Sequence, residues 1–284
     1  MHLSFNTLSF EQFSIEQYIE FCKRFGYEYI ELRLGAGLWT DTLSDTELSA
    51  ARSKLDQAGI KIICIGSSLN IRGDYPENTA EFERALRIAA ALGAKGVRIM
   101  VGTYRHYSTE PLLPMDYDGT VNWIARMCDR SLEYGINVCV ELHSDYCTGK
   151  KVGKLLDNVA RPNAKALWDI MNPLCSGEAI EETYRYLKGR ISHLHMKNGI
   201  HDPNPAALEF IYTAMENGTL PLFEIFKLME QEEQGEIIYS FEWVERFKPE
   251  LQVLKLSEEK VLESYVNCMR AYKKRFESHE GGSI

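Results

Sequence analysis

The chain has 284 residues, of which 45% are hydrophobic and 26% charged, a composition that excludes disordered, collagen-like and low-complexity proteins. Its formal net charge of −9 provides no overall attraction for the phosphates of DNA or RNA, so no nucleic-acid partner is expected. No segment approaches the roughly 18 consecutive apolar residues of a membrane span, and the N-terminus does not read as a secretory leader. Seven scattered cysteines without a C-x-x-C pair are typical of reduced thiols. We therefore expect a cytoplasmic protein that has no membrane partner.

Short apolar segments rich in β-branched and aromatic residues alternate along the chain with longer amphipathic segments. The pattern predicts eight strands, at residues 2–6, 28–34, 61–69, 96–102, 136–143, 165–171, 191–198 and 236–244. Most of the intervening segments open on Ser or Asp and close on Gly, as capped helices do. The last amphipathic segment, 257–277, is predicted to be the eighth helix, and residues 278–284 to be a frayed tail.

Eight strands with a helix after each, in a chain of 284 residues, give about 36 residues per unit. This repeat predicts an α/β fold, a single (β/α)8 TIM barrel. An open doubly wound sheet is the alternative, but the G-x-G-x-x-G motif expected after its first strand is missing. No linker rich in Pro, Gly or Ser divides the chain, so we expect residues 1–284 to form one domain.

Ionisable residues lie in the last four predicted strands, near the strand ends where barrel enzymes have their active sites. Burying a charge without a partner costs several kcal/mol, so acids in apolar strands need an opposite charge, hydrogen bonds or a metal. Three carboxylates with one imidazole suit Mn²⁺, Mg²⁺ or Co²⁺, and Zn²⁺ is a further candidate. The sequence therefore predicts one divalent metal ion, bound by Glu141, Asp169, His195 and Glu242.

Five motifs in chain order resemble a known family. They are YEYIELR at 27–33, VCVELH at 138–143, LWDIMNP at 167–173, HLHMKNG at 193–199 and IIYSFEW at 237–243. Together they resemble the xylose isomerase-like barrels described as sugar phosphate isomerases and epimerases, which include ketose 3-epimerases, hydroxypyruvate isomerases and inosose dehydratases. The resemblance implies that the four residues bind the metal and that Glu141 and Glu242 also transfer protons on opposite faces of the substrate.

The resemblance implies an isomerase or epimerase that acts on a sugar, a sugar phosphate or a related hydroxy-ketone by proton transfer next to a carbonyl. Two positions depart from the family pattern. Asn172 stands where many relatives have the His of D-x-x-H, and Lys197 stands near a position where ketose epimerases often have Arg. We therefore expect substrate recognition to differ from that of the ketose epimerases, with Asn172 among the substrate contacts.

Five further residues are candidates for substrate binding, each beside a purely structural alternative. His143 and Lys197 lie one period beyond the proposed ligands, where they either contact substrate or form solvated rim charges. Glu31 is either a polar residue facing the substrate or a rim group paired with Arg33. Trp39 either covers the pocket or packs within its loop. Arg246 either holds an anionic group or forms a surface ion pair.

Three other functions remain open for such a chain. A dehydratase of the inosose or dehydroshikimate type would use the same site to expel a β-hydroxyl group. Endonuclease IV, a DNA-repair member of the superfamily, would need further metal ligands and a basic surface. A metal-free sugar-binding or scaffold barrel would lack bound metal. The small-molecule partner is expected to be a carbohydrate, and assembly into a homo-oligomer is left open.

Overall fold

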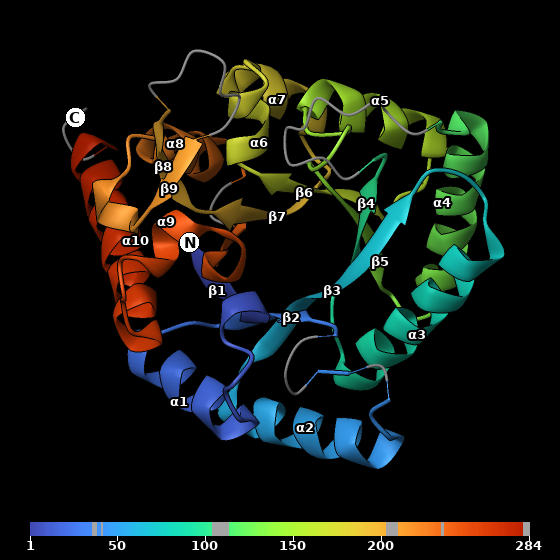
Figure 1. Cartoon of the computed structure of the whole chain (residues 1–284), viewed down its shortest axis with the longest axis horizontal. Helices are drawn as coiled ribbons and strands as arrows, with labels where there is room; N and C mark the ends of the chain where they lie inside the picture. Colours follow the sequence, from blue (N-terminus) through green and yellow to red (C-terminus); the bar gives the residue numbers. More distant parts are fainter. Residues whose placement is uncertain (36–38, 41, 104–113, 203–209, 234–235, 281–284) are drawn as a thin grey trace.

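A computed structural model describes residues 1–35, 39–40, 42–103, 114–202, 210–233 and 236–280. Eight parallel strands close into a barrel in the order β1-β10-β7-β6-β5-β4-β3-β2. Helices surround these strands on the outside (Figure 1). The predicted (β/α)8 barrel is therefore confirmed, whereas the assignment of residues 1–284 to one domain stays a prediction.

The barrel strands lie close to the predicted segments. They are β1 (His2–Asn6), β2 (Tyr29–Arg33), β3 (Lys61–Ile71), β4 (Gly96–Val101), β5 (Asn137–Glu141), β6 (Ala164–Asp169), β7 (Ile191–Met196) and β10 (Ile238–Phe241). The last of these is shorter than its prediction of 236–244, and Glu242 follows it directly. Because parallel strands of a barrel all end at the same face, the ends of β5, β6, β7 and β10 meet there, as expected.

The helices follow the strands as predicted. The α-helices are α1 (Ile15–Phe25), α2 (Asp45–Ala58), α3 (Pro76–Leu92), α4 (Tyr117–Leu132), α5 (Gly149–Val159), α6 (Met171–Cys175), α7 (Ile180–Leu187), α8 (Leu222–Glu232), α9 (Pro249–Gln252) and α10 (Glu258–Glu280). Short 3-10 helices are η1 (Thr7–Ser9), η2 (Met215–Asn217) and η3 (Glu245–Phe247). The tail prediction was wrong for residues 278–280, which continue α10, while 281–284 lie outside the described residues. None of the described helices combines the length and hydrophobicity that crossing a membrane requires.

Local sequence signals explain where the first helices begin and end. Ser14 and Ser44 each accept a hydrogen bond from the backbone N–H three residues later, which closes a capping box. Gly26 and Gly59 end the same helices in the left-handed conformation, at φ 87° and 74°. These signals are short-range, which is why the sequence alone could locate the helices.

A two-stranded antiparallel ribbon, β8 (Asn198–His201) with β9 (Phe210–Thr213), was not predicted. The amide of Asn198 fastens its base by donating to the Met215 carbonyl at 2.7 Å. Gly199 permits the close pairing, because a Cβ there would lie 2.9 Å from the Ile211 carbonyl oxygen. The ribbon extends the chain beyond β7 and brings Tyr212 to the mouth of the barrel.

The barrel interior is layered. A small buried apolar cluster lies inside it, separate from the core between strands and helices: Tyr29, Ile63, Cys64, Cys139, Leu167 and Ile238. Because side chains repeat every second residue on one face of a strand, the residues two positions after four of these form the next layer. That layer contains Glu31, Glu141, Asp169 and Ser240. The strands thus place an ionisable layer directly above an apolar one.

Candidate metal centre

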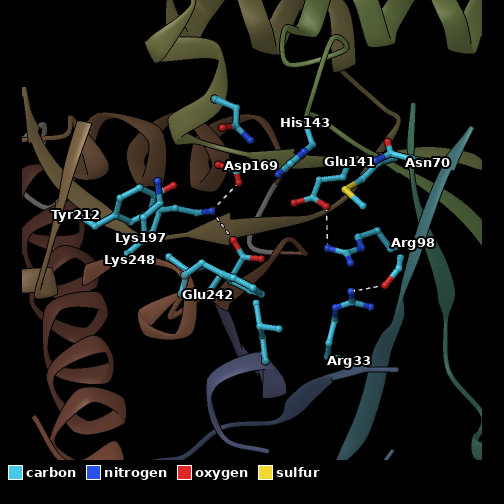
Figure 2. Close-up of a pocket in the computed structure, with 16 residues that line it drawn as sticks. Arg33, Asn70, Arg98, Glu141, His143, Asp169, Lys197, Tyr212, Glu242 and Lys248 are labelled. Atoms are coloured by element: carbon cyan, nitrogen blue, oxygen red, sulfur yellow. Dashed lines mark hydrogen bonds and ion pairs between the residues drawn. The ribbon is translucent and has the colours of Figure 1, made fainter. Parts of the chain in front are cut away.

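The C-terminal ends of the barrel strands surround a cavity of about 430 Å³, large enough for a small-molecule ligand. Figure 2 shows the side chains that point into it. Six of the residues proposed from the sequence line the cavity: Glu141, His143, Asp169, Asn172, Lys197 and Glu242. The polar groups of the last four barrel strands are therefore brought together in one place.

The four predicted metal ligands form one cluster. Glu141, Asp169, His195 and Glu242 each offer a ligand atom, and these atoms all lie within 4.8 Å of one another. His195 Nδ1 is 3.1 Å from Glu141 Oε1 and 3.4 Å from Glu242 Oε1. All four residues are buried. A single ion could contact atoms at these separations, so the donors fit a mononuclear site of oxygen and nitrogen ligands.

Glu31 orients the imidazole of this cluster from the opposite side of the barrel. Its Oε2 accepts a hydrogen bond of 2.8 Å from His195 Nε2 and one of 3.1 Å from the Ser240 hydroxyl. Burial opposes the charge of Glu31, but the His195 and His193 rings outweigh it and hold the pKa of Glu31 well below its ordinary value. A carboxylate on the far nitrogen fixes the ring and leaves Nδ1 facing the ligand cluster.

Carboxylates on both sides keep the His195 ring charged in this structure. Burial would lower the pKa of His195, but Glu242 and Glu31 together raise it well above its ordinary value. Its Nδ1–H donates to Glu141 and its Nε2–H donates to Glu31. A metal ligand must be deprotonated, so metal binding at Nδ1 requires loss of that proton and becomes tighter as the pH rises.

Lys197 contacts two of the four proposed ligands. Its Nζ donates to Asp169 Oδ2 at 2.6 Å and also to Glu242 Oε2. Both bonds are drawn in Figure 2, with Lys197 reaching between the two carboxylates. Burial opposes the ammonium charge, but Asp169 and Glu242 raise the pKa of Lys197 well above its ordinary value. The ammonium therefore already neutralises carboxylates that a metal would share.

Arg98 balances the remaining carboxylate. Its Nη1 donates to Glu141 Oε2 at 2.8 Å, and both side chains are buried. Burial would raise the pKa of Glu141, but Arg98 and His195 lower it far below its ordinary value. Glu141 is thus ionised at neutral pH. A buried carboxylate with two cationic neighbours can be retained because the surrounding hydrogen bonds compensate its desolvation.

Of the other residues proposed to contact substrate, some line the cavity and some do not. His143 lines the cavity, with Nδ1 2.9 Å from the Ser144 hydroxyl, and Asn172 donates to the Leu142 carbonyl at 2.7 Å. Glu31 and Trp39 are fully buried and do not line it. Glu31 contacts His195 and Ser240, whereas Arg33 donates to Leu34, Gly66 and Ser68.

Trp39 and Arg246 also lie away from the cavity. Trp39 stacks on Tyr18, with ring centroids 6.4 Å apart. Arg246 forms an exposed ion pair with Glu11, beside a separate surface hollow. Trp39 thus packs against α1, Arg246 pairs at the surface, and neither residue lines the cavity.

Several cavity residues were not proposed from the sequence: Arg33, Ser68, Asn70, Arg98, Tyr212 and Lys248. Arg98 carried a usable signal, since a charge inside the apolar strand GVRIMV follows the same logic as Asp169. Tyr212 and Lys248 had no such signal. They meet in space, with the Lys248 ammonium 4.5 Å from the Tyr212 ring centroid, because the unpredicted ribbon folds toward α9.

A second group of possible ligands lies deeper in the barrel. Glu31, His193 and His195 also bring ligand atoms within 4.8 Å of one another. His193 Nε2 is 3.6 Å from Glu31 Oε2 and has no hydrogen-bond partner within the part of the chain that the structure describes. Neither Glu31 nor His193 lines the cavity, so this group supports His195 from below and has no described access for a substrate.

Comparisons with known proteins agree with this architecture. The family model for the xylose isomerase-like TIM barrel matches residues 19–265. No curated protein matches the sequence. The three solved structures described next are between 14% and 19% identical to the chain, so their likeness is one of fold.

Three of these structures show how complete the likeness is. A D-psicose 3-epimerase from Clostridium cellulolyticum H10, solved with D-tagatose, has a TM-score of 0.75 and 14% identity, over 97% of this chain and 99% of that one. The IolI protein, solved with a bound zinc atom, has a TM-score of 0.73 and 19% identity, over 97% and 99%. The probable 3-DHS dehydratase AsbF from Bacillus anthracis has a TM-score of 0.70 and 19% identity, over 95% and 99%.

Proposed function

Because the chain belongs to the xylose isomerase-like TIM barrel family, we propose that it is a divalent-metal-dependent enzyme that isomerises or epimerises a sugar or a related hydroxy-ketone. The observation that carries the proposal is the convergence of four buried ligand atoms within 4.8 Å at the floor of a small cavity. Structures of a ketose epimerase and of a zinc-bound barrel with the same fold support it.

The donor set fits a hard or borderline divalent ion. Glu141, Asp169, His195 and Glu242 would hold it, and Glu31 would keep the ring of His195 in place from the other nitrogen. When bound, such an ion supplies Lewis-acid polarisation of a substrate carbonyl. Mn²⁺, Mg²⁺ and Co²⁺ suit three carboxylates and one imidazole, and Zn²⁺ also accepts these ligands.

Two carboxylates would move the proton. Burial would raise the pKa of Glu242, but His195 and Lys197 lower it below its ordinary value, so Glu242 is ionised and able to accept a proton at neutral pH. Glu141, the last residue of β5, is ionised because Arg98 and His195 lower its pKa against the effect of burial. One carboxylate would take the proton from the carbon next to the carbonyl, and the other would return a proton to the opposite face.

Two neighbouring cations would stabilise the charge that develops on substrate oxygen. Lys197 and Arg98 line the cavity beside these carboxylates and are already oriented by them. Preorganised donors of this kind are worth more in a buried site than in water. His143 and Asn172, which also line the cavity, would contact substrate hydroxyl groups.

Metal content tests the proposal directly. Protein reconstituted with Mn²⁺, Co²⁺ or Zn²⁺ is expected to retain about one ion per chain by elemental analysis, and to exchange hydrogen with solvent at the carbon next to the carbonyl of a ketose. Asp169→Asn is expected to retain much less, because one carboxylate ligand is lost. Asp157→Asn is the matched control, since Asp157 forms an exposed ion pair with Arg190.

Absence of stoichiometric metal in the reconstituted wild-type protein would contradict the proposal and favour a metal-free binding barrel. The product identifies the reaction that follows proton removal. An epimer or isomer has the same composition as the substrate, whereas dehydration forms a conjugated chromophore that absorbs in the ultraviolet.

We expect the Lys197 ammonium to weaken metal binding. Its ammonium contacts Asp169 and Glu242, so an incoming ion competes with it for two carboxylates. Lys197→Met is expected to bind Mn²⁺ about tenfold more tightly in a calorimetric titration, a difference of about 1.4 kcal/mol, and to lose substrate turnover. Lys248→Met, a cation on the same cavity wall beside Tyr212, is the control. Weaker Mn²⁺ binding by Lys197→Met would show that the ammonium supports the site.

A further inference from the structure

Two arginines lie side by side on the wall of the cavity opposite Lys197, Tyr212 and Lys248 (Figure 2). Arg33 ends β2, and Arg98 lies in the middle of β4. Both pack over Gly66 of the intervening strand: a Cβ at Gly66 would be 3.5 Å from Arg33 Cδ and 3.7 Å from Arg98 Cζ. Two like charges are thus held close together, which is unfavourable unless something compensates them.

An irregularity in β3 explains how the pair is held. Its pairing with β4 shifts after Gly66, so that Gly66 to Asn70 span only Arg98 to Met100 on the partner strand. The segment between Gly66 and Asn70 therefore forms a β-bulge, a feature that is common beside active sites. Two backbone carbonyls of β3 accept hydrogen bonds from the arginines. Gly66 O accepts from Arg33 Nη1 at 2.8 Å, and Ser67 O accepts from Arg98 Nη2 at 2.6 Å.

The two guanidinium groups differ in whether a carboxylate balances their positive charge. Arg98 pairs with Glu141, whereas Arg33 contacts neutral acceptors: the carbonyls of Leu34 and Gly66 and the hydroxyl of Ser68, at 3.1, 2.8 and 2.6 Å. Among the described residues, no carboxylate lies within ion-pair distance of Arg33. Three of its five N–H donors are used, which leaves two without a described acceptor.

Further observations indicate that a ligand belongs beside this pair. Arg98 Nε and Asn70 Oδ1 are buried without a hydrogen-bond partner among the described residues, and both residues line the same cavity. Burial and the adjacent Arg98 lower the pKa of Arg33 to about 10, although the carboxylates of Glu141, Glu242 and Glu31 oppose this shift from beyond ion-pair distance. Arg33 stays charged at neutral pH nonetheless. Arg33 is half-buried and lines the cavity, and a guanidinium with N–H donors that have no described acceptor matches the planar, two-point recognition of a carboxylate or phosphate.

We propose that Arg33, with Ser68 and Arg98 beside it, forms an anion subsite, and that the substrate is a sugar or hydroxy-ketone that carries a carboxylate or a phosphate group. This inference rests on the proposed function, because it extends the same cavity. The anionic group docks against Arg33 at the β2 to β4 side. The carbon chain then extends toward Glu141 and Glu242, so that the anion positions the reacting carbon between the two carboxylates.

Calorimetric titration with three five-carbon probes tests the subsite: xylitol, xylonate and xylitol 5-phosphate. Metal-free protein is used first, so that chelation of the probe by a metal does not contribute, and the titrations are then repeated with Mn²⁺. Xylonate or xylitol 5-phosphate is expected to bind at least about tenfold more tightly than xylitol. The reason is that hydrogen bonds between a guanidinium and an anionic group are stronger than those between neutral groups. The tighter of the two identifies the anion as carboxylate or phosphate.

Arg33→Gln is expected to abolish this preference, and Arg33→Lys, which keeps the charge but not the planar fork, to restore part of it. Arg246→Gln is the matched control, because Arg246 forms an exposed ion pair with Glu11 outside the cavity. An unchanged Mn²⁺ affinity in Arg33→Gln would show that the variant is folded. If Arg33→Gln does not fold, the subsite is tested by whether the wild-type protein binds xylonate or xylitol 5-phosphate more tightly than xylitol.

Equal affinity for all three probes in the wild-type protein, or an anion preference that survives Arg33→Gln in a folded variant, would overturn the subsite. The outcome is distinguishable from failure of the proposed function. Equal affinity for the three probes in wild-type protein that still binds metal and exchanges hydrogen removes the subsite alone. An anion preference in a protein that never binds metal removes the proposed function alone.

Discussion

Glu242→Gln is expected to slow hydrogen exchange at the carbon next to the substrate carbonyl by about 10²–10⁴-fold, the range typical of a lost general acid or base. Gln has nearly the same shape as Glu but cannot accept the proton. The Glu242 carboxylate is buried on the cavity floor beside His195 and Lys197, and both keep it ionised. Its loss therefore removes a group that is ready to act as a base at neutral pH.

The measurement uses NMR detection of deuterium incorporation from D₂O into ketoses and sugar acids. It is made at a metal concentration that saturates the variant, because Glu242 is also a proposed ligand. Glu245→Gln is the control: Glu245 accepts a hydrogen bond from Trp243 Nε1 at 2.9 Å and does not line the cavity. If metal-saturated Glu242→Gln exchanges hydrogen within about threefold of the wild-type rate, this result would contradict the assignment of Glu242 as a proton-transfer group.

Glu31→Gln is expected to lower the free energy of unfolding of the metal-free protein by about 3 kcal/mol. Breaking a buried ion pair leaves an uncompensated charge, which typically costs about 3–5 kcal/mol. The lower end applies because Glu141 and Glu242 still lie 3.1 and 3.4 Å from the His195 ring. The amide that replaces the carboxylate would still meet His195, but without the charge that balances it.

The pH dependence has a definite sign. The folded-state pKa of Glu31 is depressed by His195 and His193 against the effect of burial, so the carboxylate contributes stability at neutral pH. That contribution is lost as the pH falls below the ordinary carboxyl range and through the folded-state pKa. The stability difference between wild type and Glu31→Gln is therefore expected to shrink in acid.

Urea unfolding followed by circular dichroism measures this difference. Glu28→Gln provides the control, because Glu28 pairs with His2 at the surface and exposed pairs are worth less than about 1 kcal/mol. A Glu31→Gln midpoint that matches the Glu28→Gln midpoint, with unchanged slope, would show that Glu31 does not stabilise the buried layer.

Much of the architecture follows from local sequence patterns. Hydrophobic periodicity over five to twenty residues predicts the eight barrel strands and the longer helices between them, and capping residues such as Ser14 and Gly26 mark the ends. The ionisable residues of the four later strands could be proposed as one cluster, because parallel strands in a barrel end at a common face. The β8–β9 ribbon escaped prediction, since NGIH and FIYT are too short to show a period.

The sequence by itself determined the barrel, its family resemblance and the four residues Glu141, Asp169, His195 and Glu242 as candidate ligands. Only the tertiary structure decided which groups surround them. Glu31 contacts His195 across 164 residues of chain, and Arg33 lies beside Arg98 because both pair in register with Gly66 of β3, which has no side chain to separate them. Periodicity reports which face of its own strand a residue occupies. It carries no information about which distant side chain meets that face once the barrel closes, so the charge balance of the site is a property of the closed fold.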